Sequence, residues 1–273
     1  MSVLSRMALS SIRLASRAWP FPFGKDFTSY VGAFATKVGL LGSEWYEFQP
    51  GLWMRLNMRD LVQQTILLEG VWDPSLTKFI QSNLSSGDVF VDVGAHVGYF
   101  TLLASRRVGP SGTVLAIEPN PFALDQLRQN VERNDLRNVL VVPTACGASR
   151  GAVKLYLHSE SNSSMASMYP GEATASSAVE VPCTKLDELC QQRGVQRMKL
   201  VKVDVEGAEL FVLRGMTRIM REMRPGIVLE LHPQLLEDVG TPLDAVMALL
   251  REFDYVLEPL GGHSNYVCRP VDR

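Results

Sequence analysis

From Gly87 onward, apolar runs of strand length alternate with longer segments whose apolar residues recur at helical spacing. This alternation predicts right-handed crossovers and a mostly parallel α/β sheet, doubly wound with helices on both faces. The expected strands are residues 89–93, 113–117, 139–143, 200–205, 227–231, 255–257 and 266–268. The expected helices are 99–108, 121–133, 186–192, 209–220 and 241–252. A further pair of strands, 152–157 and 178–183, is expected around a Ser- and Met-rich loop.

The composition is that of an ordinary globular protein, with 46% hydrophobic and 21% charged residues among 273. A net charge of −2 provides no overall positive field, so no nucleic-acid partner is expected. No apolar run approaches the roughly 20 residues of a membrane span. The cysteines fit neither a C-x-x-C nor a zinc pattern, which favours buried thiols in a reducing, cytoplasmic compartment.

Residues 1–86 differ from the rest and are expected to form a mainly helical N-terminal extension, with perhaps one hairpin, on one side of a main domain of residues 87–273. Within the extension, "DPSLTKFIQSNL" predicts a helix with Asp73 as N-cap and Pro74 in its first turn. Residues 1–25 contain four basic residues and no acid. A helix packed on its own domain, weak contact with a membrane surface and N-terminal targeting are all open interpretations.

Acidic residues stand where four of the expected strands end: Asp92, Glu118, Asp204 and Glu230. In open sheets of this type, ligands bind beyond the carboxyl ends of the strands. We therefore expect the functional site at this edge of the sheet.

The turn after the first of these strands contains Gly94 and Gly98, but His96 occupies the middle position of the pyrophosphate-binding glycine pattern. Glu118 lies 20 residues beyond Gly98, where an acid can accept hydrogen bonds from ribose hydroxyls. Together these features favour a nucleoside cofactor without pyrophosphate. S-adenosylmethionine fits better than NAD, while the glycines alone also suit a plain strand–helix turn.

Lys202, Asp204 and Glu206 interrupt an otherwise apolar strand with a period of two, which places them on one face if the strand continues that far. Buried groups of this kind must be paired or in use. One interpretation is an ion pair of Lys202 with either acid that only anchors the following helix. The other is catalysis, with His232 as a further candidate for the general base.

Four segments, "VFVDVGAHVGYFTLLASRRVGPSGTVLAIEPNP", "LRQNVERNDLRNVLVVPTACGASRGAVKL", "KLVKVDVEGAELFVLRG" and "VLELHP", resemble the FkbM family of S-adenosylmethionine-dependent methyltransferases. The resemblance spans residues 87–233. It implies a class I (Rossmann-like) methyltransferase sheet of seven strands, the last antiparallel. It also implies that the cofactor contacts Asp92, Gly94, Ala95 and Gly98. Glu118 would then bind the ribose. Asn120 and residues 144–146, including Ala145, would lie near the adenine. His96 departs from the asparagine that family members often have.

The resemblance implies O-methylation of a hydroxyl on a sugar, polyketide or other small metabolite. The catalytic candidates are Lys202, Asp204, Glu206 and His232. The last three could act as base, or Asp204 and Glu206 could hold a divalent metal that polarises the hydroxyl.

The tetrapeptide N-P-P-Y is absent and "DVEG" stands in its place, which disfavours N-methylation of bases or glutamine. The alternatives are an NAD-dependent oxidoreductase and a non-catalytic nucleotide-binding protein. Residues 159–177 and the extension are expected to form the walls of the acceptor pocket, and the sequence carries no signal for an oligomeric state.

Overall fold

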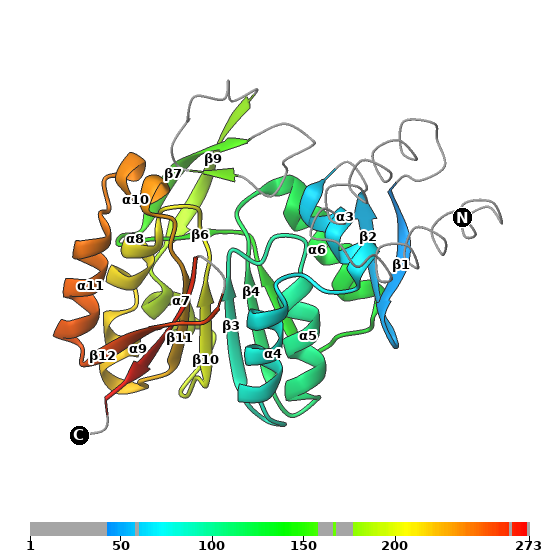
Figure 1. Cartoon of the computed structure of the whole chain (residues 1–273), viewed down its shortest axis with the longest axis horizontal. Coiled ribbons are helices and arrows are strands. Elements are labelled where there is room, and N and C mark those ends of the chain that lie inside the picture. The colour runs from blue at the N-terminus through cyan, green and yellow to red at the C-terminus, as the bar shows by residue number, and fades with distance from the viewer. Residues whose placement is uncertain (1–42, 58–59, 158–165, 168–176, 262–263, 272–273) are drawn as a thin grey trace.

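The computed structural model describes residues 43–57, 60–157, 166–167, 177–261 and 264–271 (Figure 1). The basic segment of residues 1–25 and most of the loop of residues 159–177 lie outside these ranges. Among the described helices, none combines the length and the apolar character needed to cross a membrane. All four cysteines are buried free thiols, as expected.

Seven of the described strands form the central sheet, in the order β12-β13-β11-β10-β3-β4-β5 (Figure 1). β13 pairs antiparallel with both β11 and β12, whereas the remaining neighbours pair parallel. This arrangement confirms the predicted mostly parallel sheet with one antiparallel strand. The strands are β3 (Val89–Val93), β4 (Thr113–Ile117), β5 (Val139–Val142), β10 (Leu200–Val203), β11 (Gly226–Glu230), β12 (Tyr255–Pro259) and β13 (Asn265–Pro270).

Successive residues of the central strands belong to two different cores, one on each face of the sheet. On β3, Phe90 belongs to the first core while Val91 and Val93 belong to the second. Because both faces are buried, the strands read as nearly continuous apolar runs. The first face is covered by α3 (Leu61–Glu69), α4 (Pro74–Asn83), α5 (Tyr99–Val108) and α6 (Pro121–Arg133). The second is covered by α7 (Leu186–Gln192), α8 (Glu209–Arg214), α9 (Thr217–Glu222), α10 (Pro233–Val239) and α11 (Leu243–Glu252).

The single helix predicted over residues 209–220 is wrong, because α8 ends and α9 begins around Gly215. A Cβ at Gly215 would lie 2.1 Å from the carbonyl oxygen of Gly147, so the chain turns here in close backbone contact. α10 was not predicted, although Pro233 at its start is a typical first-turn residue. β10 ends at Val203 rather than at residue 205, so Glu206 lies in a loop and not on the strand.

The described part of the extension contains a hairpin as well as α3 and α4, so the extension is not helical throughout. The hairpin consists of β1 (Ser43–Gln49) and β2 (Leu52–Asn57). It is joined to α6, since the Arg55 amide donates to Asn130 Oδ1 at 2.7 Å and the Arg133 guanidinium lies over the rings of Trp45 and Trp53. The predicted cap of α4 is confirmed, because the Asp73 side chain accepts from the Leu76 amide.

Four further strands form a second sheet, in the order β6-β9-β7-β8, beyond the carboxyl edge of the central sheet (Figure 1). They are β6 (Ala145–Cys146), β7 (Gly151–Leu157), β8 (Ala166–Ser167) and β9 (Ser177–Thr184). The antiparallel pairing of β7 with β9 confirms the two strands expected around the loop. This sheet supplies one wall of the site.

Candidate active site

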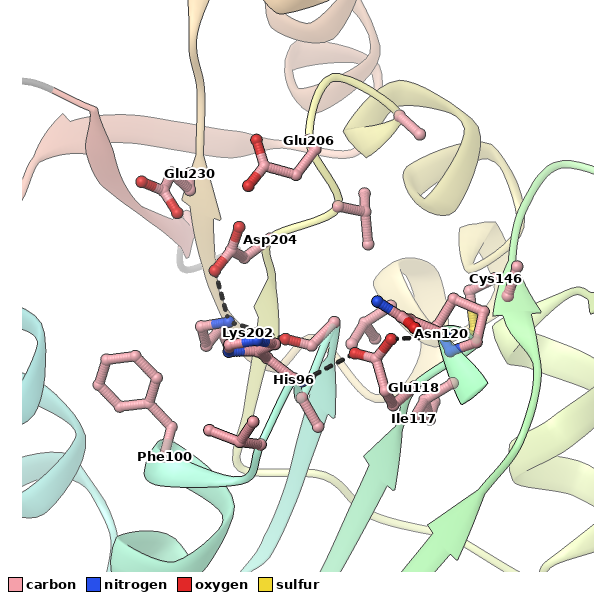
Figure 2. Close-up of a pocket in the computed structure, with 18 of the residues that line it drawn as sticks. His96, Phe100, Ile117, Glu118, Asn120, Cys146, Lys202, Asp204, Glu206 and Glu230 are labelled. Atoms are coloured by element: carbon pink, nitrogen blue, oxygen red, sulfur yellow. Dashed lines mark hydrogen bonds and ion pairs between the residues drawn. The ribbon is translucent and has the colours of Figure 1, made fainter. Parts of the chain in front are cut away.

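A cavity of about 570 Å³ opens at the carboxyl ends of β3, β4, β10 and β11 (Figure 2). The acids that end these strands thus converge at the predicted edge of the sheet. Nine of the eleven predicted site residues line the cavity: Gly94, Ala95, Glu118, Asn120, Ala145, Lys202, Asp204, Glu206 and His232. The other two, Asp92 and Gly98, lie behind the lining.

The turn after β3 is built from backbone contacts that leave it rigid. The amides of Gly94 and Ala95 both donate to the Ile117 carbonyl oxygen at 3.0 Å, and the His96 amide donates to Glu118 Oε2 at 2.7 Å. Gly94 has φ +79°, and a Cβ there would lie 1.8 Å from the carbonyl oxygen of Asp204. These three amides are therefore already engaged within the protein, unlike the free amides of a phosphate-binding loop.

Glu118 and its neighbours form one end of the cavity. The Glu118 carboxyl group is buried and accepts from the amides of His96 and Asn120. Burial raises its pKa to about 7, although the two hydrogen bonds oppose that shift. Each carboxyl oxygen retains a second acceptor position for a ligand hydroxyl. Thr144, Ala145 and Cys146 complete this end of the cavity.

A buried cation, Lys202, lies between two acids near the centre of the cavity. Its ammonium nitrogen is 2.9 Å from Asp204 Oδ2 and 3.6 Å from Asp92 Oδ1, and it donates to the Gly94 carbonyl oxygen at 3.4 Å. Burial opposes the charged form of Lys202, but Asp204 and Asp92 outweigh it and raise the pKa above the ordinary lysine value. An ammonium held in this way is no proton acceptor near neutral pH, so the geometry favours a positioning role for Lys202.

Three carboxyl groups, from Asp204, Glu206 and Glu230, face a common space above Lys202 (Figure 2). Burial raises the pKa of Glu206 to about 8, with additional repulsion from Asp204 and Glu230. Repulsion from Asp204 and burial likewise raise the pKa of Glu230.

Asp204 differs from the other two carboxyl groups. Burial alone would raise its pKa, but Lys202 and a hydrogen bond with Glu230 hold the pKa below its usual range. Near pH 7, Asp204 is thus ionised beside Glu206, which is largely protonated at that pH. His232 Nε2 lies 3.1 Å from Glu230 Oε1 at the exposed rim.

Residues 92–257, more than half of the chain, match the model of the methyltransferase FkbM domain. The chain belongs to the FkbM family of S-adenosylmethionine-dependent methyltransferases. The match reaches further toward the C-terminus than the resemblance over residues 87–233 indicated.

Relatives of this chain are named as methyltransferases in several organisms. Methyltransferase sdnD of Sordaria araneosa is 31% identical, over 58% of this chain and 75% of its own. Hexuronic acid methyltransferase AglP of Haloferax volcanii is 25% identical, over 72% of this chain and 78% of its own. The 31-O-demethyl-FK506 methyltransferase FkbM of Streptomyces tacrolimicus is 27% identical, over 62% and 72%. A solved structure of methyltransferase FkbM from Methylobacillus flagellatus KT aligns with a TM-score of 0.45 at 15% identity, covering 90% of this chain and 60% of that one.

In this FkbM domain the loop "DVEGAE" is organised by its last residue, whose role the sequence analysis missed. The buried carboxyl group of Glu209 accepts from the amides of Val205 and Gly207. Gly207 has φ +96°, and a Cβ there would lie 2.6 Å from the carbonyl oxygen of Leu235. These contacts hold Asp204 and Glu206 at the cavity. In the sequence, the short distance of Glu209 from these two acids is the signal that could have indicated its role.

The extension also contributes to the FkbM site, as expected for a wall of the cavity. Leu61, Val62 and Ile66 of α3 line it together with Trp72, and α5 adds Tyr99 and Phe100. In the sequence these apolar residues resemble ordinary core positions, so they were not predicted individually. Among the described residues, no group of three or more His, Cys, Asp or Glu side chains is arranged to hold a metal ion.

Proposed function

We propose that this chain transfers a methyl group from S-adenosylmethionine to a hydroxyl of a sugar, polyketide or other small metabolite. The observation that carries the proposal is that one cavity joins a carboxyl group suited to ribose, Glu118, to an acidic cluster around Asp204. S-adenosylmethionine brings a sulfonium cation that suits this cluster. The pyrophosphate of NAD would meet acids and engaged turn amides instead, so the geometry disfavours the dehydrogenase alternative.

The cofactor fits the residues present. Gly94, Ala95 and Glu118 would hold its ribose side, and Asn120 and Ala145 its adenine. When bound, it supplies an activated methyl group and thus needs only an aligned acceptor and removal of one proton. The relatives named for hexuronic acid and for 31-O-demethyl-FK506 support a small-molecule acceptor.

Asp204 is the residue that we assign to the acceptor hydroxyl. It stays ionised beside Lys202, so it can accept the hydroxyl hydrogen bond and take the proton as the new carbon–oxygen bond makes that proton acidic. Its hydrogen bond with Glu230, and that of Glu230 with His232, lead from this carboxylate to the exposed rim. The proton thus has a path to solvent.

We assign residues 87–273 to the catalytic domain and residues 1–86 to an extension that covers it. Residues from both parts line the cavity. Four buried free thiols suit a reducing cytoplasmic compartment.

The proposed function is tested by calorimetry with S-adenosylhomocysteine and NADH, followed by transfer of labelled methyl groups to a panel of sugars and polyketides. We expect the chain to bind S-adenosylhomocysteine but not NADH. We also expect the label to appear in a methyl ether formed at a hydroxyl of the acceptor. Binding of NADH alone would refute the proposal.

Asp204→Asn is expected to reduce turnover at least about tenfold while S-adenosylhomocysteine still binds, because the amide has the same shape but accepts no proton. Methyl transfer and calorimetry measure the two effects separately. Asp135→Asn is the matched control, since Asp135 is exposed and, among the described residues, its carboxyl group pairs with Arg137. Unchanged turnover in Asp204→Asn would reduce Asp204 to a structural residue.

The acidic cluster also predicts a pH dependence of cofactor selection. A sulfonium favours the ionised form of Glu206, whose pKa burial and neighbouring acids raise to about 8. Affinity for S-adenosylmethionine relative to S-adenosylhomocysteine should therefore rise several-fold as the pH passes through that value. Glu206→Gln should flatten this rise in relative affinity. Because the ligands titrate in the same way with either protein, comparison with this variant separates the titration of Glu206 from that of the ligands. An identical pH profile in the variant would place the sulfonium elsewhere.

A further inference from the structure

His96 occupies the middle of the turn after β3 in an unusual state. Its φ of +50° is in the left-handed region, which few non-glycine residues adopt. The imidazole lines the cavity, and its Nε2 atom is buried without a hydrogen-bond partner among the described residues (Figure 2). A buried polar nitrogen left without a partner is costly, so it indicates a group that is completed by a ligand.

Several nitrogen donors around His96 are already engaged. The amides of Gly94 and Ala95 donate to Ile117, and the His96 amide donates to Glu118. The Lys202 ammonium is shared between Asp204, Asp92 and the Gly94 carbonyl oxygen. Among the described residues, Nε2 of His96 is a buried side-chain nitrogen without a partner, so a negative group bound over this turn would meet it as an available donor.

S-adenosylmethionine and its product carry such a group, the α-carboxylate of their amino-acid end. If the proposed function holds, this carboxylate needs a donor, whereas the α-ammonium finds an acceptor in Glu206. We propose that His96 Nε2–H donates a hydrogen bond to the cofactor α-carboxylate. His96 is then a specificity residue for the amino-acid end of the cofactor. Its side chain provides the donor at the position where a pyrophosphate-binding turn has glycine.

The charges that face His96 are compatible with this role. Burial lowers its pKa and Lys202 acts in the same direction, while Asp60 at the start of α3 and Asp204 oppose the shift. The free imidazole is therefore neutral near pH 7, and a neutral ring with its proton on Nε2 donates one hydrogen bond. A carboxylate bound beside the ring would oppose this lowering of the pKa.

The test compares two ligands that differ only at the amino-acid end. S-adenosylhomocysteine has the carboxylate, whereas 5′-methylthioadenosine keeps the nucleoside and sulfur without it. In His96→Phe, which keeps a planar ring without a donor, affinity for S-adenosylhomocysteine should fall at least about tenfold. Affinity for 5′-methylthioadenosine should stay within about twofold. His96→Asn, which tolerates the left-handed backbone and restores an N–H donor, should recover part of the loss.

Each calorimetric outcome decides a separate point. Equal losses of affinity for both ligands in His96→Phe would show that the ring only shapes the cavity. No loss of affinity for either ligand would show that Nε2 is not used. Either result would overturn the role of His96 and leave the proposed function in place. A wild-type chain that binds neither ligand would overturn the proposed function as well. Thermal unfolding of the variants shows whether each remains folded.

Discussion

Lys202→Met is expected to lower the free energy of unfolding by about 3–5 kcal/mol, because it removes one partner of a buried ion cluster. Lys202 is 3% exposed and Asp92 is fully buried, so removal of the ammonium leaves a buried carboxyl group without its cation. Methionine fills a similar volume, which confines the change to charge. Urea unfolding followed by circular dichroism measures the loss.

The pH dependence of the variant identifies the cause. Burial already raises the pKa of Asp92 above its unfolded value, although Lys202 and the Thr101 hydroxyl oppose the shift, so loss of Lys202 should raise this pKa further. A raised carboxyl pKa means that stability is lost as the pH rises through the titration range, so the variant should be more stable at pH 5 than at pH 8.

The double variant Asp92→Asn/Lys202→Met removes the unpaired charge and should recover a large part of the loss. A single variant as stable as the wild type would contradict the proposed energetic role of the cluster.

The architecture followed from the sequence because each central strand is an apolar run and the intervening helices have one apolar face. Predictions failed where distant backbone segments meet. Gly215 ends α8 in close backbone contact with Gly147, and no local signal encodes that contact. The antiparallel placement of β13 was implied by the family resemblance rather than by periodicity.

The site divides in the same way. Strand-end acids and the period of two brought Lys202 and Asp204 to attention, and Lys202 does pair with Asp204, as one interpretation held. The second partner, Asp92, depends on the register of β10 beside β3, which sets Lys202 opposite Asp92. Sequence alone does not specify that register. Likewise, α3 borders the cavity while it packs against the β1–β2 hairpin, so its lining residues read as ordinary core positions.

Gly94→Ala is expected to damage the site more than any loss of a single polar group there. The added Cβ would lie 1.8 Å from the carbonyl oxygen of Asp204 and 3.0 Å from its carbonyl carbon. Both atoms are backbone, so no rotamer change relieves the clash, and the β3 turn and the Asp204 loop must separate. We expect a loss of at least about 3 kcal/mol in unfolding free energy. We also expect S-adenosylhomocysteine affinity to fall at least about 100-fold, measured by calorimetry.

Gly194→Ala provides the matched control for this prediction. Gly194 has φ +67°, close to the +79° of Gly94, but a Cβ there meets nothing within 4 Å. It should therefore show only the backbone cost of about 1–2 kcal/mol, with unchanged affinity for S-adenosylhomocysteine. Equal effects of the two substitutions would mean that strain, and not contact with Asp204, accounts for the loss. A larger effect of the Gly94 substitution on both stability and affinity would link cofactor binding to the close approach of the β3 turn and the Asp204 loop. Asp204 can reach the methyl-transfer position only while this turn lies against it.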